Sequence, residues 1–68
     1  MAKHTEHLHA AVLRKRALAK LLGVSQAHID RLRAKNEFPA PIRLGEQAVG
    51  WRMDAIESWL DSRPVVQH

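Results

Sequence analysis

The sequence contains no cysteine, and no apolar run in it approaches the roughly 20 residues that a membrane span requires. Without cysteine the chain can form neither a disulfide framework nor a thiolate zinc site, which suits a reducing compartment. The first residues also lack the apolar stretch of a signal peptide. We therefore expect an intracellular, cytoplasmic protein with no membrane association.

The chain also lacks the residue constellations of an enzyme. Its 68 residues make one small domain, which is too short to wrap a deep catalytic cleft. It has no nucleophile–base pair, no carboxylate dyad and no glycine-rich phosphate loop. His4, His7 and His9 cluster near the start, but no carboxylate or thiolate completes a metal site at a suitable spacing. We expect no catalysis, no cofactor and no metal.

Positive charge is concentrated in the first two thirds of the chain. The formal net charge is +4, distributed as +4 over residues 1–20, +2 over 21–43 and −2 over 44–68. The simplest reason for this asymmetry is a polyanionic partner. The alternative is that solvated helix faces are rich in lysine and arginine without any such partner.

Residues 18–32 are the most informative stretch, because they predict two short helices joined by a tight corner. Gly23 supplies the left-handed residue that ends the first helix, and Ser25 is a good N-cap for the second. The predicted helices cover about 15–22 and 26–35, with Asn36 as a left-handed cap. Apolar residues at helical spacing define the face of the first helix that we expect to be buried. They are Leu18, Leu21 and Leu22.

The second helix has the pattern of a DNA-binding recognition helix. Ile29 and Leu32 point back at the first helix, while Ala19 is small, as a close helix crossing requires. Val24 fills the corner. A plain helical hairpin shares part of this pattern, but the spacing favours a helix-turn-helix whose second helix enters the major groove.

The remaining residues predict a wing and a last helix. The run 11–14 forms a small strand or an extended lead-in, and the prolines of 38–41 predict a stiff, non-helical connector. Alternation predicts a hairpin with its turn at 45–47. Its expected buried face consists of Ile42, Leu44, Val49 and Trp51. In the last helix, Asp54 and Glu57 resemble a capping box, and an apolar stripe ends before Pro64.

Together these elements predict a mainly α fold with a small β-hairpin, a winged helix-turn-helix. We expect a flexible arm over 1–10, the folded domain over 11–63 and a frayed tail over 64–68. Trp51 and Trp59 fit the core better than a stacking platform for bases. The expected core is Leu13, Leu18, Leu22, Ile29, Leu32, Phe38, Leu44, Trp51, Ile56 and Trp59.

Three segments resemble a known family. They are Leu22-Gly23-Val24-Ser25 with Ile29 and Arg31-Leu32, then 37–45 with its Phe-Pro-Ala-Pro, and then Val49-Gly50-Trp51-Arg52 leading into 56–60. From about Val12 to Leu60 the chain resembles the AlpA-type prophage regulators, relatives of phage excisionases in the MerR-like winged-helix group. The resemblance implies a DNA-binding protein that regulates a neighbouring gene or assists excision of a mobile element, with RNA polymerase or integrase as possible partners.

The chain departs from that family pattern at two places. Members commonly expose arginine, serine, threonine or tyrosine on the second helix, whereas this chain has Gln26, Ala27, His28 and Asp30. The wing tip often carries a basic residue, and here it is Glu46-Gln47. The first change puts the target sequence in doubt, and the second weakens the wing as a phosphate contact.

Four exposed residues of the second helix are candidates for reading bases. Gln26 can pair with adenine, and Ala27 can touch a thymine methyl group. Arg31 can reach guanine or a phosphate. Asp30 either accepts a hydrogen bond from a cytosine amine or orients a neighbouring arginine. We favour the second role, because phosphates repel a bare carboxylate.

Nine further residues are candidates for phosphate contacts. They are Lys15, Arg16, Lys20, Ser25, His28, Arg33, Lys35, Arg43 and Arg52. Arg52 has the alternative of pairing with an acidic residue of the last helix.

Three functions are compatible with these residues. The leading one is a sequence-specific DNA-binding regulator, acting as a monomer or loaded side by side on DNA. The second is an excisionase-like factor that bends its site, and the third is a protein-interaction module that docks another chain through its last helix.

Overall fold

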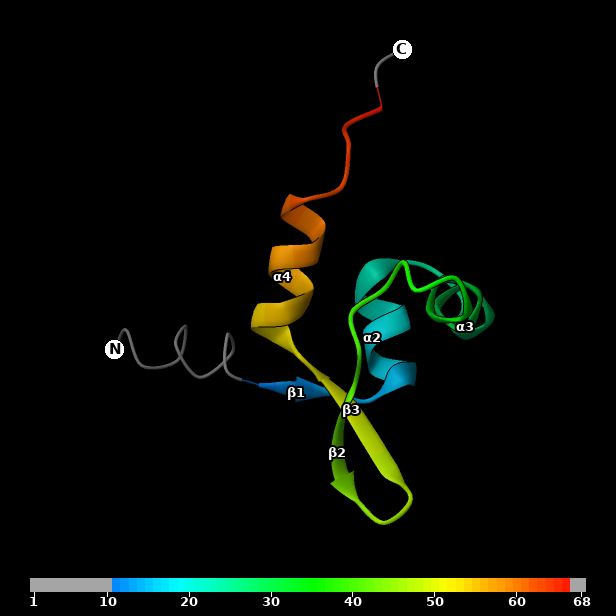
Figure 1. The fold of residues 1–68 in the computed structure, drawn as a ribbon, viewed down its shortest axis with the longest axis vertical. Helices are drawn as coiled ribbons and strands as arrows, with labels where there is room; N and C mark the ends of the chain where they lie inside the picture. The colour runs from blue at the N-terminus through cyan, green and yellow to red at the C-terminus, as the bar shows by residue number, and fades with distance from the viewer. Residues whose placement is uncertain (1–10, 67–68) are drawn as a thin grey trace, which may run out of the picture.

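The computed structural model describes residues 11–66, so the arm expected over 1–10 and the last two residues lie outside the described part. It has three helices and a three-stranded antiparallel sheet, and it confirms a small, mainly α fold of winged-helix type (Figure 1). The elements are β1 (Val12–Leu13), α2 (Lys15–Leu22), α3 (Gln26–Ala34), β2 (Ile42–Gly45), β3 (Ala48–Arg52) and α4 (Met53–Asp61). Pro64–Val66 follow α4 outside any helix or strand.

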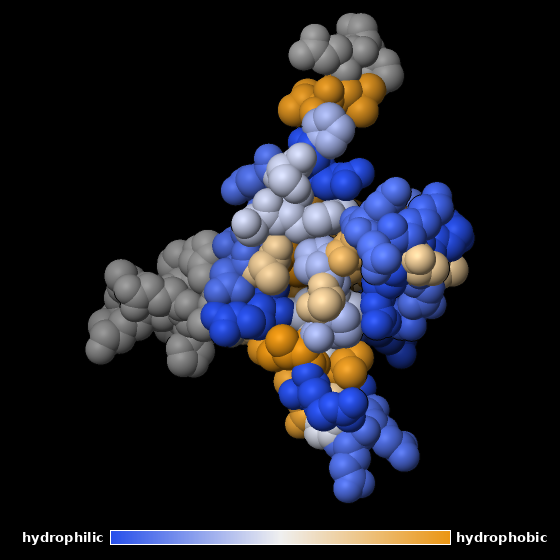
Figure 2. All heavy atoms as spheres, in the orientation of Figure 1, coloured by the Kyte–Doolittle hydropathy of each residue, from blue (hydrophilic) through white to orange (hydrophobic). Residues whose placement is uncertain are grey.

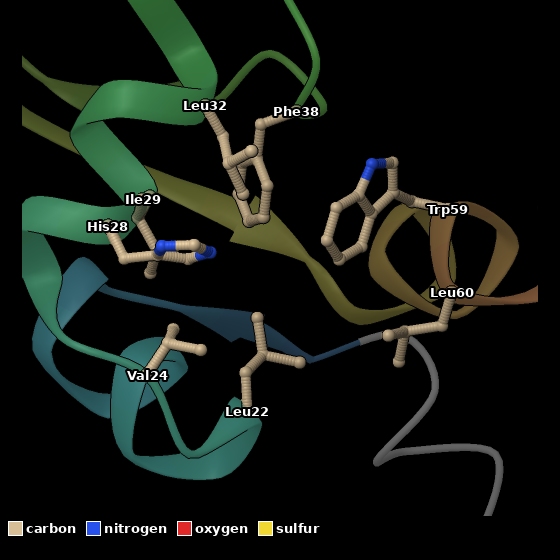
Figure 3. A pocket seen from close by; sticks show the side chains of 8 residues that line it. All are labelled: Leu22, Val24, His28, Ile29, Leu32, Phe38, Trp59 and Leu60. Carbon is tan, nitrogen blue, oxygen red and sulfur yellow. The ribbon is translucent and has the colours of Figure 1, made fainter. Parts of the chain in front are cut away.

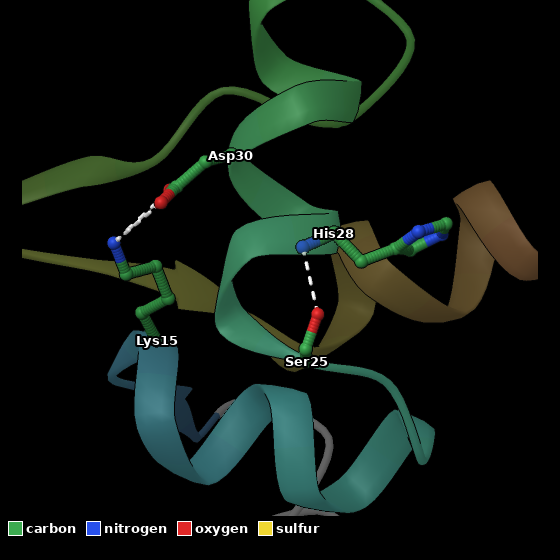
Figure 4. Close-up of polar contacts among 4 residues, drawn as sticks. All are labelled: Lys15, Ser25, His28 and Asp30. Carbon is green, nitrogen blue, oxygen red and sulfur yellow. Dashed lines mark hydrogen bonds and ion pairs between the residues drawn. The ribbon is translucent and has the colours of Figure 1, made fainter.

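The corner between α2 and α3 is built as the sequence predicts. Gly23 ends α2 with a φ of 74°, in the left-handed region. Ser25 then caps α3, since its hydroxyl oxygen accepts a hydrogen bond from the backbone N–H of His28 at 3.0 Å (Figure 4). Asn36, with a φ of 59°, terminates the turn after α3. The relative direction of the two helices is therefore set by local backbone geometry.

For one residue of the predicted buried face of α2, the prediction is wrong. Leu18 and Ala19 are buried and Leu22 is half-buried, but Leu21 is 59% exposed. At 100° per residue, the side of α2 that meets the core is centred between Leu18, Ala19 and Leu22, and Leu21 lies well outside it. The buried face is narrower than the leucine pattern indicates.

The predicted faces of the wing are also wrong, and the strand register gives the reason. In the sheet, β3 lies between β1 and β2, and Ile42 pairs with Gly50 while Arg43 pairs with Val49. Paired residues share one side of a sheet, so Arg43, not Ile42, lies on the side of Val49. Of the four residues expected to be buried, Trp51 is 1% exposed. The other three are exposed: Ile42 by 39%, Leu44 by 47% and Val49 by 38%.

Gly50, on the central strand, is buried beneath side chains of both neighbouring strands. A Cβ at this position would lie 2.7 Å from Val12 Cγ1 and 2.9 Å from Leu44 Cδ1. Leu44 therefore covers the glycine instead of joining the core, and a side chain at position 50 would force its neighbours to shift.

The core lies between the helices and one side of the sheet. Leu18, Ala19, Ile29, Trp51 and Ile56 are buried. Four partly buried residues pack against them: Leu13, Leu22, Val24 and Phe38. The predicted core is thus confirmed in its centre, with Leu32 and Trp59 only half-buried and Leu44 exposed.

The connector from α3 to β2 is held by both tryptophans. The indole N–H of Trp51 donates to the Pro39 carbonyl at 2.8 Å, and that of Trp59 donates to the Glu37 carbonyl at 3.0 Å. The Phe38 ring meets both indoles edge-on, with centroid distances of 6.0 Å to Trp51 and 4.8 Å to Trp59. This short segment fixes the wing relative to α3.

The capping box predicted for the last helix is wrong. α4 begins at Met53, directly after β3, and its N-cap Arg52 makes no side-chain cap hydrogen bond. Asp54 instead accepts from Arg52, at 3.0 Å from Nε and 2.6 Å from Nη2. This hydrogen-bonded pair lowers the pKa of the Asp54 carboxyl and raises the pKa of the Arg52 guanidinium. The expected alternative for Arg52, pairing with an acid of the last helix, is confirmed.

Candidate nucleic-acid interface

The solvent side of α3 gathers the four residues predicted to read bases. Ile29 is fully buried and Leu32 half-buried, so α3 packs on the body through one narrow stripe. The face of α3 seen in Figure 2 is mainly hydrophilic. The four predicted readers are all exposed: Gln26, Ala27, Asp30 and Arg31. The helix can therefore present polar side chains to a groove while its packing against the rest of the protein stays intact.

A hollow lined by cations lies beside this helix, where the start of α2, α3 and the wing meet. Its volume is about 310 Å³. The residues that line this cationic hollow are Arg14, Lys15, Arg16, Gln26, Arg33, Gln47, Val49 and Trp51. Four cations thus surround one depression that also contains the first residue of α3. Clustered cations of this kind are suited to contact phosphate oxygens.

Arg33, one of the residues that line the cationic hollow, contacts the core through Trp51. Its guanidinium carbon lies 5.5 Å from the centre of the Trp51 ring, within the range of a cation–π contact. Because Trp51 is part of the core, this contact connects an exposed cation of α3 to the rigid interior.

The partner of Asp30 differs from the one expected. Lys15, the first residue of α2, places its Nζ 3.0 Å from Asp30 Oδ1 and 3.3 Å from Oδ2 (Figure 4). The expectation that Asp30 orients a neighbouring arginine is therefore wrong. The two side chains remain accessible, with exposed fractions of 36% for Lys15 and 52% for Asp30.

A second hollow lies on the other side of α3 and is apolar. Its volume is about 210 Å³, and it lies between the end of α2, α3 and α4 (Figure 3). The residues that line this apolar hollow are Leu22, Val24, His28, Ile29, Leu32, Phe38, Trp59 and Leu60. His28 thus leaves α3 on a different side from Asp30 (Figure 4).

The geometry agrees with a match to a family of phage regulators. The family model described as prophage CP4-57 regulatory protein (AlpA) matches residues 11–64. The chain belongs to the AlpA family. AlpA family proteins are DNA-binding regulators and not enzymes. A surface with clustered cations is compatible with that family. Comparison with curated proteins gave no match, and comparison with solved structures gave none.

In this AlpA family member, several predicted phosphate contacts also bond to the protein itself. Arg43 donates to the backbone carbonyls of the wing turn, at 3.4 Å to Gly45 and 3.0 Å to Glu46. Arg31 Nη2 lies 3.3 Å from His28 Nδ1. Lys20 and Lys35 are exposed near the ends of α2 and α3. Of the candidates, Lys15, Arg16 and Arg33 share the cationic hollow.

Sequence reasoning missed two polar residues of the cationic hollow, Arg14 and Gln47. Arg14 precedes α2 and completes the consecutive cations Arg14-Lys15-Arg16, a charge run that could have identified it. Gln47 belongs to the wing tip, and no local signal indicated that the tip lies near α3.

Over 11–66, no three histidine or acidic side chains gather in a way that could hold a metal ion. Within the same range, no helix has the length and apolarity to cross a bilayer. The histidines of the arm lie outside the described residues.

Proposed function

We propose that this protein is a sequence-specific double-stranded DNA-binding regulator of prophage type, which places α3 in the major groove and controls a neighbouring gene in the cytoplasm. The observation that carries the proposal is the cationic hollow directly beside the exposed polar side of α3. A phosphate backbone in that hollow would position α3 over base edges. The family match to a prophage regulatory protein supports the same function.

The roles of the base-reading residues follow from the chemistry of the groove. Gln26 can donate and accept at an adenine, and Ala27 is small enough to contact a thymine methyl group. Arg31 is exposed and can reach a guanine or a phosphate. Arg14, Arg16 and Arg33 line the hollow and suit the backbone.

Binding to labelled duplex DNA at a series of salt concentrations tests the proposal. Each phosphate contact steepens the fall of log affinity with log salt by about 0.9, so three to five contacts give a slope of about −3 to −5. Selection of bound sites from random duplexes then yields the target sequence. Binding that does not depend on salt, or no binding to any duplex, would contradict the proposal.

An excisionase-like role uses the same interface and is distinguished by its assembly on DNA. A factor that loads side by side and bends its site for an integrase gives a ladder in a gel shift and a bent duplex. A transcriptional regulator that works with RNA polymerase gives one sharp complex beside a promoter.

A protein-interaction module is the second candidate function, and the apolar hollow favours it. That hollow includes Trp59 and Leu60 of α4, and Leu60 is 45% exposed. The two functions separate by substitution, because changes on the outer side of α3 leave the apolar hollow intact.

A further inference from the structure

Asp30 stands out on the proposed interface because it is the only acidic residue of α2 or α3. A carboxylate at this position repels the phosphates that the surrounding cations attract. An exposed ion pair of this kind contributes little to stability, typically below about 1 kcal/mol. Folding therefore gives no strong reason for an acid at this position, whereas recognition of a base can.

Lys15 resolves the electrostatic conflict. Its ammonium group contacts both carboxylate oxygens, at 3.0 Å and 3.3 Å. The pair is neutral as a unit, so it can approach a duplex without the repulsion of a bare carboxylate. An ionised carboxylate offers about four acceptor positions, and an ammonium group cannot occupy them all. Since Asp30 is 52% exposed, it retains acceptors that face solvent.

We infer that Asp30, neutralised by Lys15, selects cytosine in the major groove, an inference that rests on the proposed DNA-binding function. Cytosine presents an amine donor there, which a carboxylate accepts. Guanine presents two acceptors, and thymine presents an acceptor beside a methyl group. Adenine presents a donor next to an acceptor, and the latter repels the second carboxylate oxygen.

Lys15 thereby differs in role from the other cations of α2. Although it lines the cationic hollow, its charge is engaged by Asp30 and is not available to release a counterion from DNA. Lys20, at the other end of α2, has no ion-pair partner among residues 11–66. The two lysines of one helix should thus contribute differently to the salt dependence of binding.

Site selection from a random duplex library with the full chain provides the first test. We expect the wild-type protein to select cytosine at one position and Asp30→Ala to lose that preference, by about five- to tenfold in affinity ratio. Asp30→Asn should change the selected base from cytosine to adenine, because an amide pairs with adenine at two points. Asp61→Asn removes an acid from the far end of α4 and serves as the matched control.

Salt titration on a nonspecific duplex of fixed length provides the second test. Asp30→Ala frees Lys15 and should steepen the slope by about 0.9, whereas Lys15→Met should leave it unchanged and Lys20→Met should reduce it by about 0.9. An Asp30→Ala protein that selects the wild-type sequences, or a Lys15→Met slope reduced by about 0.9, would overturn the inference while the DNA-binding function stands. Failure of the wild-type protein to bind any duplex would instead remove both.

Discussion

The two hollows on either side of α3 differ in what their residues do for the fold. The cationic hollow is lined largely by side chains with charged or amide groups, which reach it from α2, α3 and the wing. The apolar hollow is an extension of the core, since Leu22, Val24, Ile29 and Phe38 all pack in or against the buried cluster. One helix therefore has a side where sequence can vary without loss of stability and a side where it cannot.

The largest effect should come from the side that supports the fold. Ile29→Ala removes a fully buried side chain from α3 and should cost about 3–4 kcal/mol, which is comparable to the whole stability of so small a domain. Chemical denaturation followed by circular dichroism measures this loss. Leu21→Ala, on the exposed side of α2, is the matched control and should change stability by less than about 0.5 kcal/mol.

Substitutions on the outer side of α3 should lower DNA affinity and leave stability unchanged. Gln26→Ala combined with Arg31→Ala should weaken binding to the selected duplex by about 100-fold, because both exposed side chains are proposed to contact bases. The melting temperature should stay close to that of the wild-type protein. Retained affinity in this double variant would favour the protein-interaction function over DNA binding.

Gly50→Ala changes the wing and leaves α3 untouched. The new methyl group would overlap Val12 and Leu44, and relieving that overlap should cost about 1–3 kcal/mol. Because Val49 and Gln47 of the wing line the cationic hollow, DNA affinity should fall as well. Urea titration and duplex binding measure the two effects, and a variant with unchanged values for both would show that the strand spacing is not constrained.

The smallest effect concerns the Arg52–Asp54 pair, which lies outside both hollows. Because folding lowers the pKa of Asp54, the ionised pair stabilises the folded state above the ordinary carboxyl pKa of about 3.9. That contribution is lost as the pH falls through the lowered pKa of the folded state. Asp54→Asn should slightly reduce the melting temperature at pH 7. The fall in melting temperature between pH 7 and pH 3 should be smaller in this variant than in the wild-type protein. An identical pH dependence in both proteins would contradict this assignment.

The parts of the fold that could be predicted are those with local causes. Gly23, Ser25 and Asn36 act through their own backbone or through the next turn, so the limits of α2 and α3 follow from neighbouring residues. The core positions of Leu18 and Ile29 follow in the same way from helical spacing. These are the elements that place α3 on the surface.

The parts that could not be predicted depend on pairing between distant segments. The faces of the wing follow from the pairing of Ile42 with Gly50 and from an irregularity between Arg43 and Gly45, which alternation alone does not reveal. The partner of Asp30 is 15 residues away and comes from another helix. The same holds for the cationic hollow, whose residues meet only after the wing has folded beside α2.

The connector held by Trp51 and Trp59 has a consequence for how fast the protein can meet its partner. Two indole N–H groups, one from β3 and one from α4, anchor the carbonyls on both sides of Phe38. The distance from α3 to the wing is thereby set before any encounter, and the connector between them does not have to become ordered on binding. Rigid docking of this kind avoids the entropy penalty that flexible binders incur, and its rate is governed by diffusion and charge.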